Sequence, residues 1–242
     1  MDRKLKVGDT LSEVFSTYGA EAGVLLPVAF WLFLVVAIVN GVIGGNLALF
    51  PIELAVSTIA ATLYQGMVVS LVRDVQDGRR DSSIAELINS AMPVLLPLIG
   101  AGLLSGLGIG VGTVLLIVPG LILLTIWAVI APVIVVERAG VFASFGRSRG
   151  LVRGNGWPVF GVIVVAFAIA IVGSLIFTAI AASIADGILI RIVFTAIAST
   201  VTAPITALVA AVLYFRLRAI EGGPRPSAVD PPATVAPDPP PV

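Results

Sequence analysis

Three closely spaced arginines carry the most specific chemistry in the sequence: Arg147, Arg149 and Arg153. The planar guanidinium group matches the geometry of phosphate, and each basic side chain near an anionic lipid surface contributes about 1 kcal/mol of binding. These arginines therefore predict a binding site for lipid phosphate headgroups. Glu137, which precedes them, could pair with one of them or cap the short helix that carries them. The alternative is that the arginines only fix the orientation of the chain in a membrane.

Other kinds of chemistry are excluded by what the sequence lacks. It has no histidine and no cysteine, which removes zinc and haem sites, disulfides, thiol nucleophiles and imidazole acids or bases. It also has no P-loop, no H-E-x-x-H motif and no nucleophile elbow. We therefore expect no catalytic residue, no metal site and no cofactor. A net charge of zero offers no field for nucleic acid, so we expect no nucleic-acid partner.

The elements that must position the arginines are transmembrane helices. Hydrophobic residues make up 58% of the 242 residues and charged residues 12%, and the mean hydropathy is +1.12, whereas a soluble domain has about 25% charged residues. A helix needs about 20 apolar residues to cross a bilayer. The stretches without charge predict an all-α, multi-pass membrane protein, with the glycine-rich segment 106–112 as a turn in the longest stretch. The six predicted spans lie near 23–43, 52–72, 92–110, 114–136, 158–184 and 192–215.

The distribution of Lys and Arg predicts the orientation. Every one of the 14 except Arg191 lies at a chain end, between spans 2 and 3, or between spans 4 and 5. The positive-inside rule therefore places both termini in the cytoplasm and the protein in the cytoplasmic (inner) membrane. Residues 1–218 form the predicted membrane domain. Residues 219–242 hold half of the 16 prolines and predict a disordered cytoplasmic tail.

Three short amphipathic helices are predicted on the cytoplasmic side, each before a hairpin of two spans. The first two begin with capping boxes, at Thr10-Leu-Ser-Glu13 and Ser83-Ile-Ala-Glu86, followed by apolar residues at helical spacing. The third begins after Gly140 and has a looser apolar face. These units indicate a threefold pseudo-repeat of interfacial helix plus hairpin. The alternative is that any membrane protein needs short helices to cover its cytoplasmic ends.

The spans contain small and helix-breaking residues but no ionisable residue at mid-membrane. Gly102, Gly106 and Gly110 would present a small-residue face for helix contact. Pro132 and Pro204 would kink spans 4 and 6, which could leave room for a cavity between them. Because mid-membrane charges are missing, a proton- or ion-coupled pump is disfavoured, whereas a path for a small neutral solute stays open.

A further set of residues between 119 and 157 forms a signature. It comprises Pro119, Gly120, Trp127, Pro132, Glu137, Gly140, Ala143, Arg147, Ser148, Leu151, Val152, Gly154 and Trp157. This signature resembles the signature of a bacterial integral-membrane family. That family includes the membrane domain attached to some glycerophosphoryl diester phosphodiesterases and the YciC-like inner-membrane proteins. The resemblance implies a location and an architecture rather than an activity, because the hydrolase of those enzymes is a separate domain that uses histidines and metal-binding carboxylates.

The sequence thus predicts a non-catalytic protein of the cell envelope: a scaffold, a regulator or a partner of membrane lipids. The alternative is a permease or flippase-like transporter of a small or lipidic solute. A transporter should have a polar-lined cavity that reaches mid-membrane, whereas a scaffold should be packed shut there. The sequence leaves protein partners open, including a second copy of the chain.

Overall fold

Six helical segments are long and apolar enough to cross a membrane. The computed structural model describes residues 4–43, 46–78, 84–184 and 187–222, and these ranges are helical apart from turns and short extended pieces. The predicted all-α architecture with six spans is confirmed. The spans are α2 (Ala22–Ile43), α3 (Phe50–Gln76), α5 (Leu95–Leu115), the pair α6 (Ile117–Ile126) and α7 (Ile130–Glu137), α9 (Gly156–Ile184) and α10 (Ile188–Gly222).

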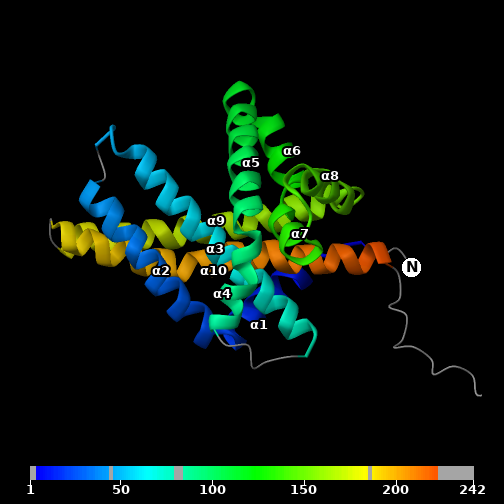
Figure 1. Cartoon of the computed structure of the whole chain (residues 1–242), viewed down its shortest axis with the longest axis horizontal. Coiled ribbons are helices and arrows are strands. Elements are labelled where there is room, and N and C mark those ends of the chain that lie inside the picture. The colour runs from blue at the N-terminus through cyan, green and yellow to red at the C-terminus, as the bar shows by residue number, and fades with distance from the viewer. Residues whose placement is uncertain (1–3, 44–45, 79–83, 185–186, 223–242) are drawn as a thin grey trace, which may run out of the picture.

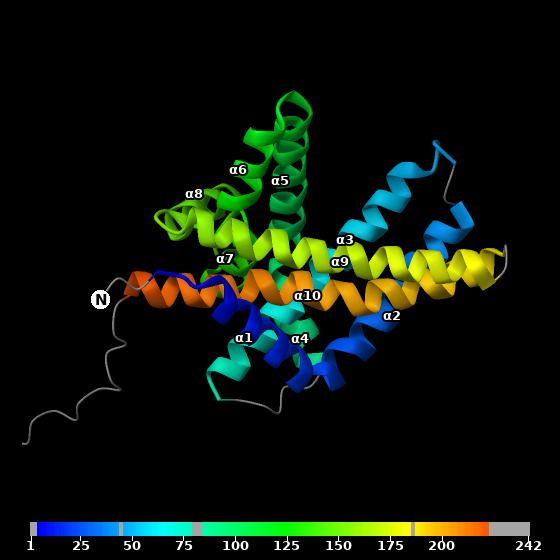
Figure 2. The same cartoon turned by 180° about the vertical axis from the view of Figure 1, so that it is seen from behind.

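A short helix precedes each hairpin, as predicted. These helices are α1 (Val7–Ala20), α4 (Ile84–Ala91) and α8 (Val141–Val152), and a single 3₁₀ turn, η1 (Met92–Val94), joins α4 to α5. In Figures 1 and 2, α9 and α10 lie side by side along the longest axis of the molecule, and the hairpins α2–α3 and α5–α6 diverge from them. The helices on either side of the loop 138–140, α7 and α8, both contact α5 and α10.

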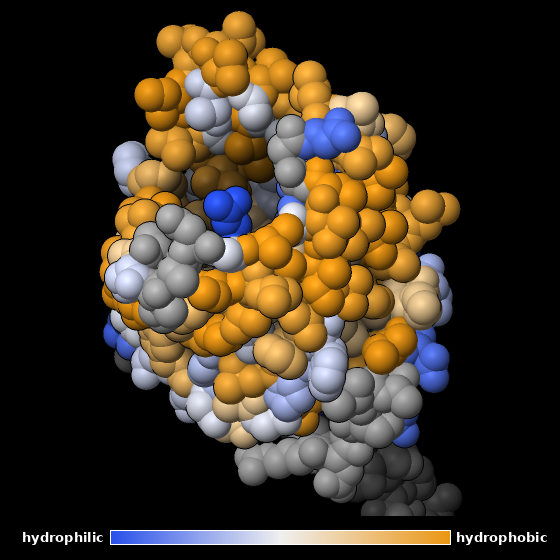
Figure 3. Space-filling model, turned by 90° about the vertical axis from the view of Figure 1, so that its left-hand side faces the viewer, coloured by the Kyte–Doolittle hydropathy of each residue, from blue (hydrophilic) through white to orange (hydrophobic). Residues whose placement is uncertain are grey.

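The helix α10 is the centre of the core. It contacts α1, α2, α3, α7, α8 and α9. Of its most apolar stretch of 18 residues, 67% is buried, against 17% of the corresponding stretch of α2. Leu208, Leu213 and Tyr214 are fully enclosed, and the alanines between them let neighbouring helices approach closely. The outer helices expose large apolar side chains, so the surface in Figure 3 is largely apolar. Such a surface suits contact with lipid.

The turn predicted at 106–112 is wrong. The helix α5 continues through these glycines to Leu115, and the chain turns at Leu116. An unpaired backbone group costs several kcal/mol in a lipid environment, so the glycines keep their helical hydrogen bonds. Some of them serve close packing instead, because a Cβ on Gly112 would lie 3.2 Å from Cα of Gly120, and a Cβ on Gly120 would lie 2.7 Å from the backbone nitrogen of Thr113.

The predicted contact face on this helix is also wrong. A Cβ built on Gly102, Gly106 or Gly110 would have no atom within 4 Å. The contacts lie on the neighbouring face, where Gly108 and Gly112 approach Trp127 and Gly120. Sequence spacing identified a row of small residues but not the side of the helix that meets α6.

Span 4 is interrupted within the predicted range 114–136, close to Pro132, where the sequence predicts a kink. The helix α6 ends at Ile126, and α7 begins at Ile130 after a turn. Pro132 has no N–H to bond the carbonyl of Ala128, so the helical ladder is interrupted here. The hydroxyl of Ser148 on α8 donates to the carbonyl of Ile126 at 2.8 Å. A side chain of α8 thus satisfies a carbonyl that the break leaves free.

The starts of the short helices differ in part from the predicted caps. The helix α1 begins at Val7, before Thr10, whose hydroxyl donates back to the carbonyl of Lys6 at 2.9 Å. Thr10 is therefore inside the helix, and the capping box predicted there is wrong. Ser83, the first residue of the second predicted box, lies outside the described residues. Gly140 is the N-cap of α8, as predicted.

The last helix runs further than the predicted span 192–215. It continues to Gly222 and so covers the first residues of the predicted tail 219–242. The part of that tail from residue 223 onward lies outside the described residues. This extension brings Glu221 within reach of α8.

Candidate functional site: a charged cluster and a groove beside α8

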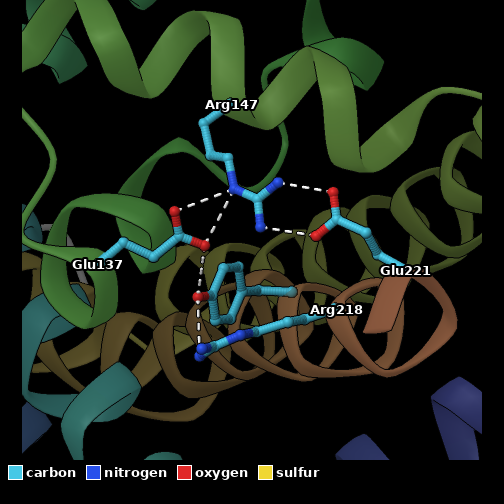
Figure 4. Close-up of polar contacts among 5 residues, drawn as sticks. Glu137, Arg147, Arg218 and Glu221 are labelled. Atoms are coloured by element: carbon cyan, nitrogen blue, oxygen red, sulfur yellow. Dashed lines mark hydrogen bonds and ion pairs between the residues drawn. The ribbon is translucent and has the colours of Figure 1, made fainter. Parts of the chain in front are cut away.

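A cluster of charged side chains joins α7, α8 and α10 (Figure 4). The guanidinium of Arg147 donates from Nε to both carboxylate oxygens of Glu137, at 3.1 and 3.0 Å, and from its terminal nitrogens to Glu221, at 2.7 Å each. Hydrogen bonds to Glu221 and then to Glu137 raise the pKa of Arg147 above its usual value. Arg147 therefore stays charged and ties the end of α7 to the end of α10.

Tyr214 and Arg218 extend this cluster along α10. The phenol of Tyr214 donates to Oε1 of Glu137 at 3.0 Å, and Arg218 donates to the phenol oxygen at 3.4 Å. Tyr214 is fully buried, whereas the side chains of Arg147 and Glu137 are 33% and 24% exposed. The cluster thus lies at the edge of the core, where two carboxylates and two guanidinium groups balance one another's charge.

Local features of the chain place Arg147 in this position. Arg138 ends α7 in the left-handed conformation, with φ of 53°, and Gly140 caps α8, so the chain changes direction between the two helices. Trp127 and Phe145 pack edge to face with ring centroids 4.9 Å apart. This contact and the Ser148 hydrogen bond fix α8 against the break between α6 and α7.

The structure separates the three arginines of the predicted lipid site. Arg147 faces two glutamates, whereas Arg149 and Arg153 are exposed and have no ion-pair partner among the residues that the structure describes. Of the two roles predicted for Glu137, the ion pair is the one formed, since Gly140 caps α8. A phosphate site here would depend on Arg149 and Arg153, and lipid binding itself stays a prediction.

Sequence reasoning missed the three partners that α10 contributes. Tyr214, Arg218 and Glu221 stand at i, i+4 and i+7, which places them on one helical face. This spacing is the signal that could have identified them. The predicted span 192–215 contains Tyr214 but ends before Arg218, and the prediction assigns Glu221 to the tail, so the three residues are not seen as one face.

An apolar groove of about 460 Å³ lies between α6 and α9, where α8 ends. Its lining includes Ile122 and Ile126 of α6 and Gly156, Trp157 and Phe160 of α9. Arg153 ends α8 three residues before α9 begins, and the Trp157 side chain beyond it is 82% exposed. Tryptophan favours the headgroup level of a bilayer. The groove is therefore an apolar surface that ends beside an exposed tryptophan and the end of α8.

A smaller cavity of about 190 Å³ lies between spans 4 and 6, where the sequence predicts room for a path. Leu124 and Ala128 line it from span 4, Gln65 from α3, and Thr206 from α10, together with apolar residues of α9 and α10. Gln65 and Thr206 are the polar residues of this lining. The interior at this depth is thus partly open but mostly apolar.

The signature positions have structural roles in this region. Gly120 permits the close contact of α6 with α5, and Pro119 lies in the first turn of α6, where its missing N–H costs nothing. Glu137 and Ser148 join α7 and α8 to their neighbours through their side-chain hydrogen bonds. Trp157 borders the groove. Gly120, Glu137 and Ser148 therefore hold the α6–α9 segment together, and Trp157 shapes its surface.

One comparison with known proteins agrees with a location in a membrane. The chain is 40% identical over 106 residues to a UPF0259 membrane protein of Pectobacterium carotovorum subsp. carotovorum, and the match covers 42% of each chain. The chain thus spans less than half the length of this curated relative. No protein-family model matches, and no solved structure matches. Together with the six spans, the match shows a multi-pass bacterial membrane protein. The narrower resemblance to phosphodiesterase-linked membrane domains and YciC-like proteins stays a hypothesis.

Proposed function

We propose that the protein spans the cytoplasmic membrane with both termini inside the cell and binds anionic phospholipid in a non-catalytic role, as a scaffold or regulator. The orientation is supported by the Lys and Arg residues, all of which except Arg191 belong to the chain ends and the loops assigned to the cytoplasm. Membership of the family suggested by the signature in 119–157 is part of this proposal.

The absence of cysteine allows a clean test of the orientation. Single cysteines are introduced at Ser12, which is exposed on α1, and at Asn46, which is exposed in the turn before α3. In intact cells a membrane-impermeant maleimide should label Asn46→Cys but not Ser12→Cys. After permeabilisation the same reagent should also label Ser12→Cys. The reverse pattern would contradict the proposed orientation.

The observation that carries the lipid assignment is the position of two arginines that have no ion-pair partner among the described residues. Arg149 lies in the last turn of α8 and Arg153 directly follows that helix, three residues before Gly156, which lines the α6–α9 groove. The hydrogen bond from Ser148 to Ile126 fixes α8 against α6, and Ile126 itself lines the groove. Arg149 follows Ser148 directly, and Arg153 precedes the first residues of α9. One phospholipid could therefore place its phosphate at these guanidinium groups and an acyl chain in the groove.

The test is a titration of the purified full chain with phosphatidylglycerol, followed by native mass spectrometry. Two arginines at about 1 kcal/mol each correspond to about 30-fold in affinity, so Arg149→Gln with Arg153→Gln should weaken binding by about that factor. The lysine double variant keeps the charge but loses the planar fork, so it should bind with intermediate affinity. Neutral phosphatidylcholine should bind the double glutamine variant and the wild type alike.

Arg138→Gln is the matched control. It is compared with the single variants Arg149→Gln and Arg153→Gln, because each of the three removes one charge from the same loop, but Arg138 lies at the opposite end of α8, about 18 Å away along a helix of 12 residues. We expect its affinity for phosphatidylglycerol to stay within about threefold of wild type, as for a distant charge screened by solvent. Equal weakening by all three glutamine substitutions would show a general charge effect and refute the site.

A second candidate function is the movement of a small or lipidic solute. It is favoured by the cavity between spans 4 and 6, whose polar residues Gln65 and Thr206 lie among apolar neighbours. The test uses proteoliposomes that contain phosphatidylglycerol with a fluorescent label. Dithionite quenches only the label in the outer leaflet, so further loss of fluorescence reports transfer of lipid between the leaflets. Transfer that Thr206→Trp abolishes by filling the cavity would favour a transporter. No transfer above protein-free vesicles would leave the scaffold or regulator assignment.

A further inference from the structure

We propose that a pocket between the C-terminal half of α9 and the N-terminal half of α10 binds a phosphate-bearing anion, with Arg191 as its cationic ligand. The pocket has a volume of about 250 Å³. Besides Arg191, its polar lining consists of Ser174, Thr178, Thr195, Ser199 and Thr202. Figure 3 looks onto this end of the molecule and shows hydrophilic side chains in a hollow of an otherwise apolar surface.

The pocket lies far from the α6–α9 groove and does not depend on it. Its α10 lining follows one helical face, at positions 191, 195, 198 and 202. Arg191 stands 23 residues before Tyr214 on the same helix, which is about 35 Å. This length slightly exceeds the hydrocarbon thickness of about 30 Å. The pocket and the Arg147 cluster therefore face opposite sides of the membrane.

The hydroxyl groups of the pocket divide into two sets. Those of Thr178 and Thr202 donate to carbonyls one turn earlier in their own helices, at 2.8 Å each. Those of Ser174, Thr195 and Ser199 have no hydrogen-bond partner within the described part of the chain. Hydroxyls on apolar helices usually bond to their own backbone. Three free hydroxyls around one pocket are therefore donors available to a ligand.

The charge of the pocket favours an anion. Arg191 is the pocket's charged lining residue and makes no ion pair with another described residue. A guanidinium group with several hydroxyl donors matches the oxygens of a phosphate group. That phosphate could belong to a lipid headgroup or to a soluble phosphate compound, because both present the same phosphate oxygens. The experiment must separate these two sources.

The test uses the full chain with Arg149→Gln and Arg153→Gln, so that lipid at the other site does not contribute. Phosphatidylglycerol is titrated and read by native mass spectrometry, and inorganic phosphate is titrated separately by calorimetry. Adding Arg191→Gln should weaken binding of at least one of these probes by about tenfold, as expected for loss of a charged hydrogen-bond donor. Arg191→Lys should retain part of the affinity.

Each outcome decides the proposal. Arg191-dependent binding of phosphatidylglycerol alone identifies a lipid headgroup, and Arg191-dependent binding of inorganic phosphate identifies a soluble anion. If neither probe binds in a way that depends on Arg191, the proposal is wrong. Should Arg191→Gln fail to fold, Thr195→Val with Ser199→Ala removes two free hydroxyls without touching the charge, and should weaken binding by about threefold or more. Unchanged binding in that variant would also overturn the site.

Discussion

Replacing Arg147 by glutamine should destabilise the protein much more than replacing Glu221 by glutamine. Both substitutions remove the same ion pair between α8 and the end of α10. Arg147→Gln also leaves Glu137 without its cation, and the Glu137 side chain is only 24% exposed. The Glu221 side chain is 47% exposed, so water can replace much of what that pair contributes.

The expected sizes follow from these exposures. An exposed ion pair contributes about 0.2–1 kcal/mol, so Glu221→Gln should lower the free energy of unfolding by about 0.5 kcal/mol. Loss of hydrogen bonds from a charged group to a partly buried carboxylate costs about 1.5–3 kcal/mol. Arg147→Gln should therefore cost about 2–3 kcal/mol. Arg147→Lys should cost an intermediate amount, because one ammonium cannot reproduce the fork that reaches both carboxylates.

Unfolding is followed by circular dichroism in mixed micelles of dodecyl maltoside and sodium dodecyl sulfate. The double variant Glu137→Gln with Arg147→Gln gives the coupling energy of the inner pair through a double-mutant cycle. A coupling energy near zero would refute our reasoning. Equal losses for Arg147→Gln and Glu221→Gln would refute it as well.

The pH dependence gives an independent check on the same cluster. A group with a raised pKa in the folded state stabilises the fold below its unfolded pKa and loses that contribution as the pH rises through the folded pKa. For Arg147 this happens only at extreme alkaline pH, because its partners raise its pKa further. Between about pH 8 and 10.5 the cluster should keep its contribution in the wild type. In Arg147→Lys the contribution should fall once the pH exceeds about 10.

Four further substitutions test the packing. Gly120→Ala should cost more than about 2 kcal/mol, because its Cβ would meet the backbone of α5, whereas Gly106→Ala should be neutral in the same unfolding assay. Asn155→Leu should cost about 1–3 kcal/mol and increase protease cleavage near α1, because the buried side chain accepts the N–H of Leu5 at 3.2 Å. Asn40→Leu should leave stability unchanged or raise it by about 1 kcal/mol, because the buried Oδ1 of Asn40 has no partner in the described part of the chain. A loss of stability above about 1 kcal/mol in Gly106→Ala would contradict the open space beside that glycine, and the same loss in Asn40→Leu would contradict the missing partner of Asn40.

The number and order of the helices could be predicted because lipid imposes strong rules. Charge-free stretches of about 20 residues become helices, and each hairpin with its short helix follows from that pattern. The internal details could not be predicted in the same way. The segment 106–112 resembles a turn because glycine usually breaks helices in water, but an apolar environment removes the alternative partners for the backbone. The choice between Gly106 and Gly108 as a contact residue depends on how α6 is placed, which no local pattern contains.

The charged cluster shows the same limit. Glu137 and Arg147 are close in sequence, and their pairing is one of two roles that the residue types allow. Glu221 lies 74 residues from Arg147 and follows a predicted span that ends at 215. Only the packing of α10 through the centre of the molecule brings it to α8. The predicted lipid site therefore contains three arginines, although the structure leaves two of them available.

The central claim is that Arg149 and Arg153 hold an anionic phospholipid against the α6–α9 groove. It is tested most directly by native mass spectrometry of the protein extracted gently from its own membrane, without added lipid. We expect the wild type to retain an anionic phospholipid at a defined stoichiometry, and the variant with both arginines replaced by glutamine to lose it. Retention of the same lipid by both proteins, or no retained lipid on the wild type, would contradict the claim.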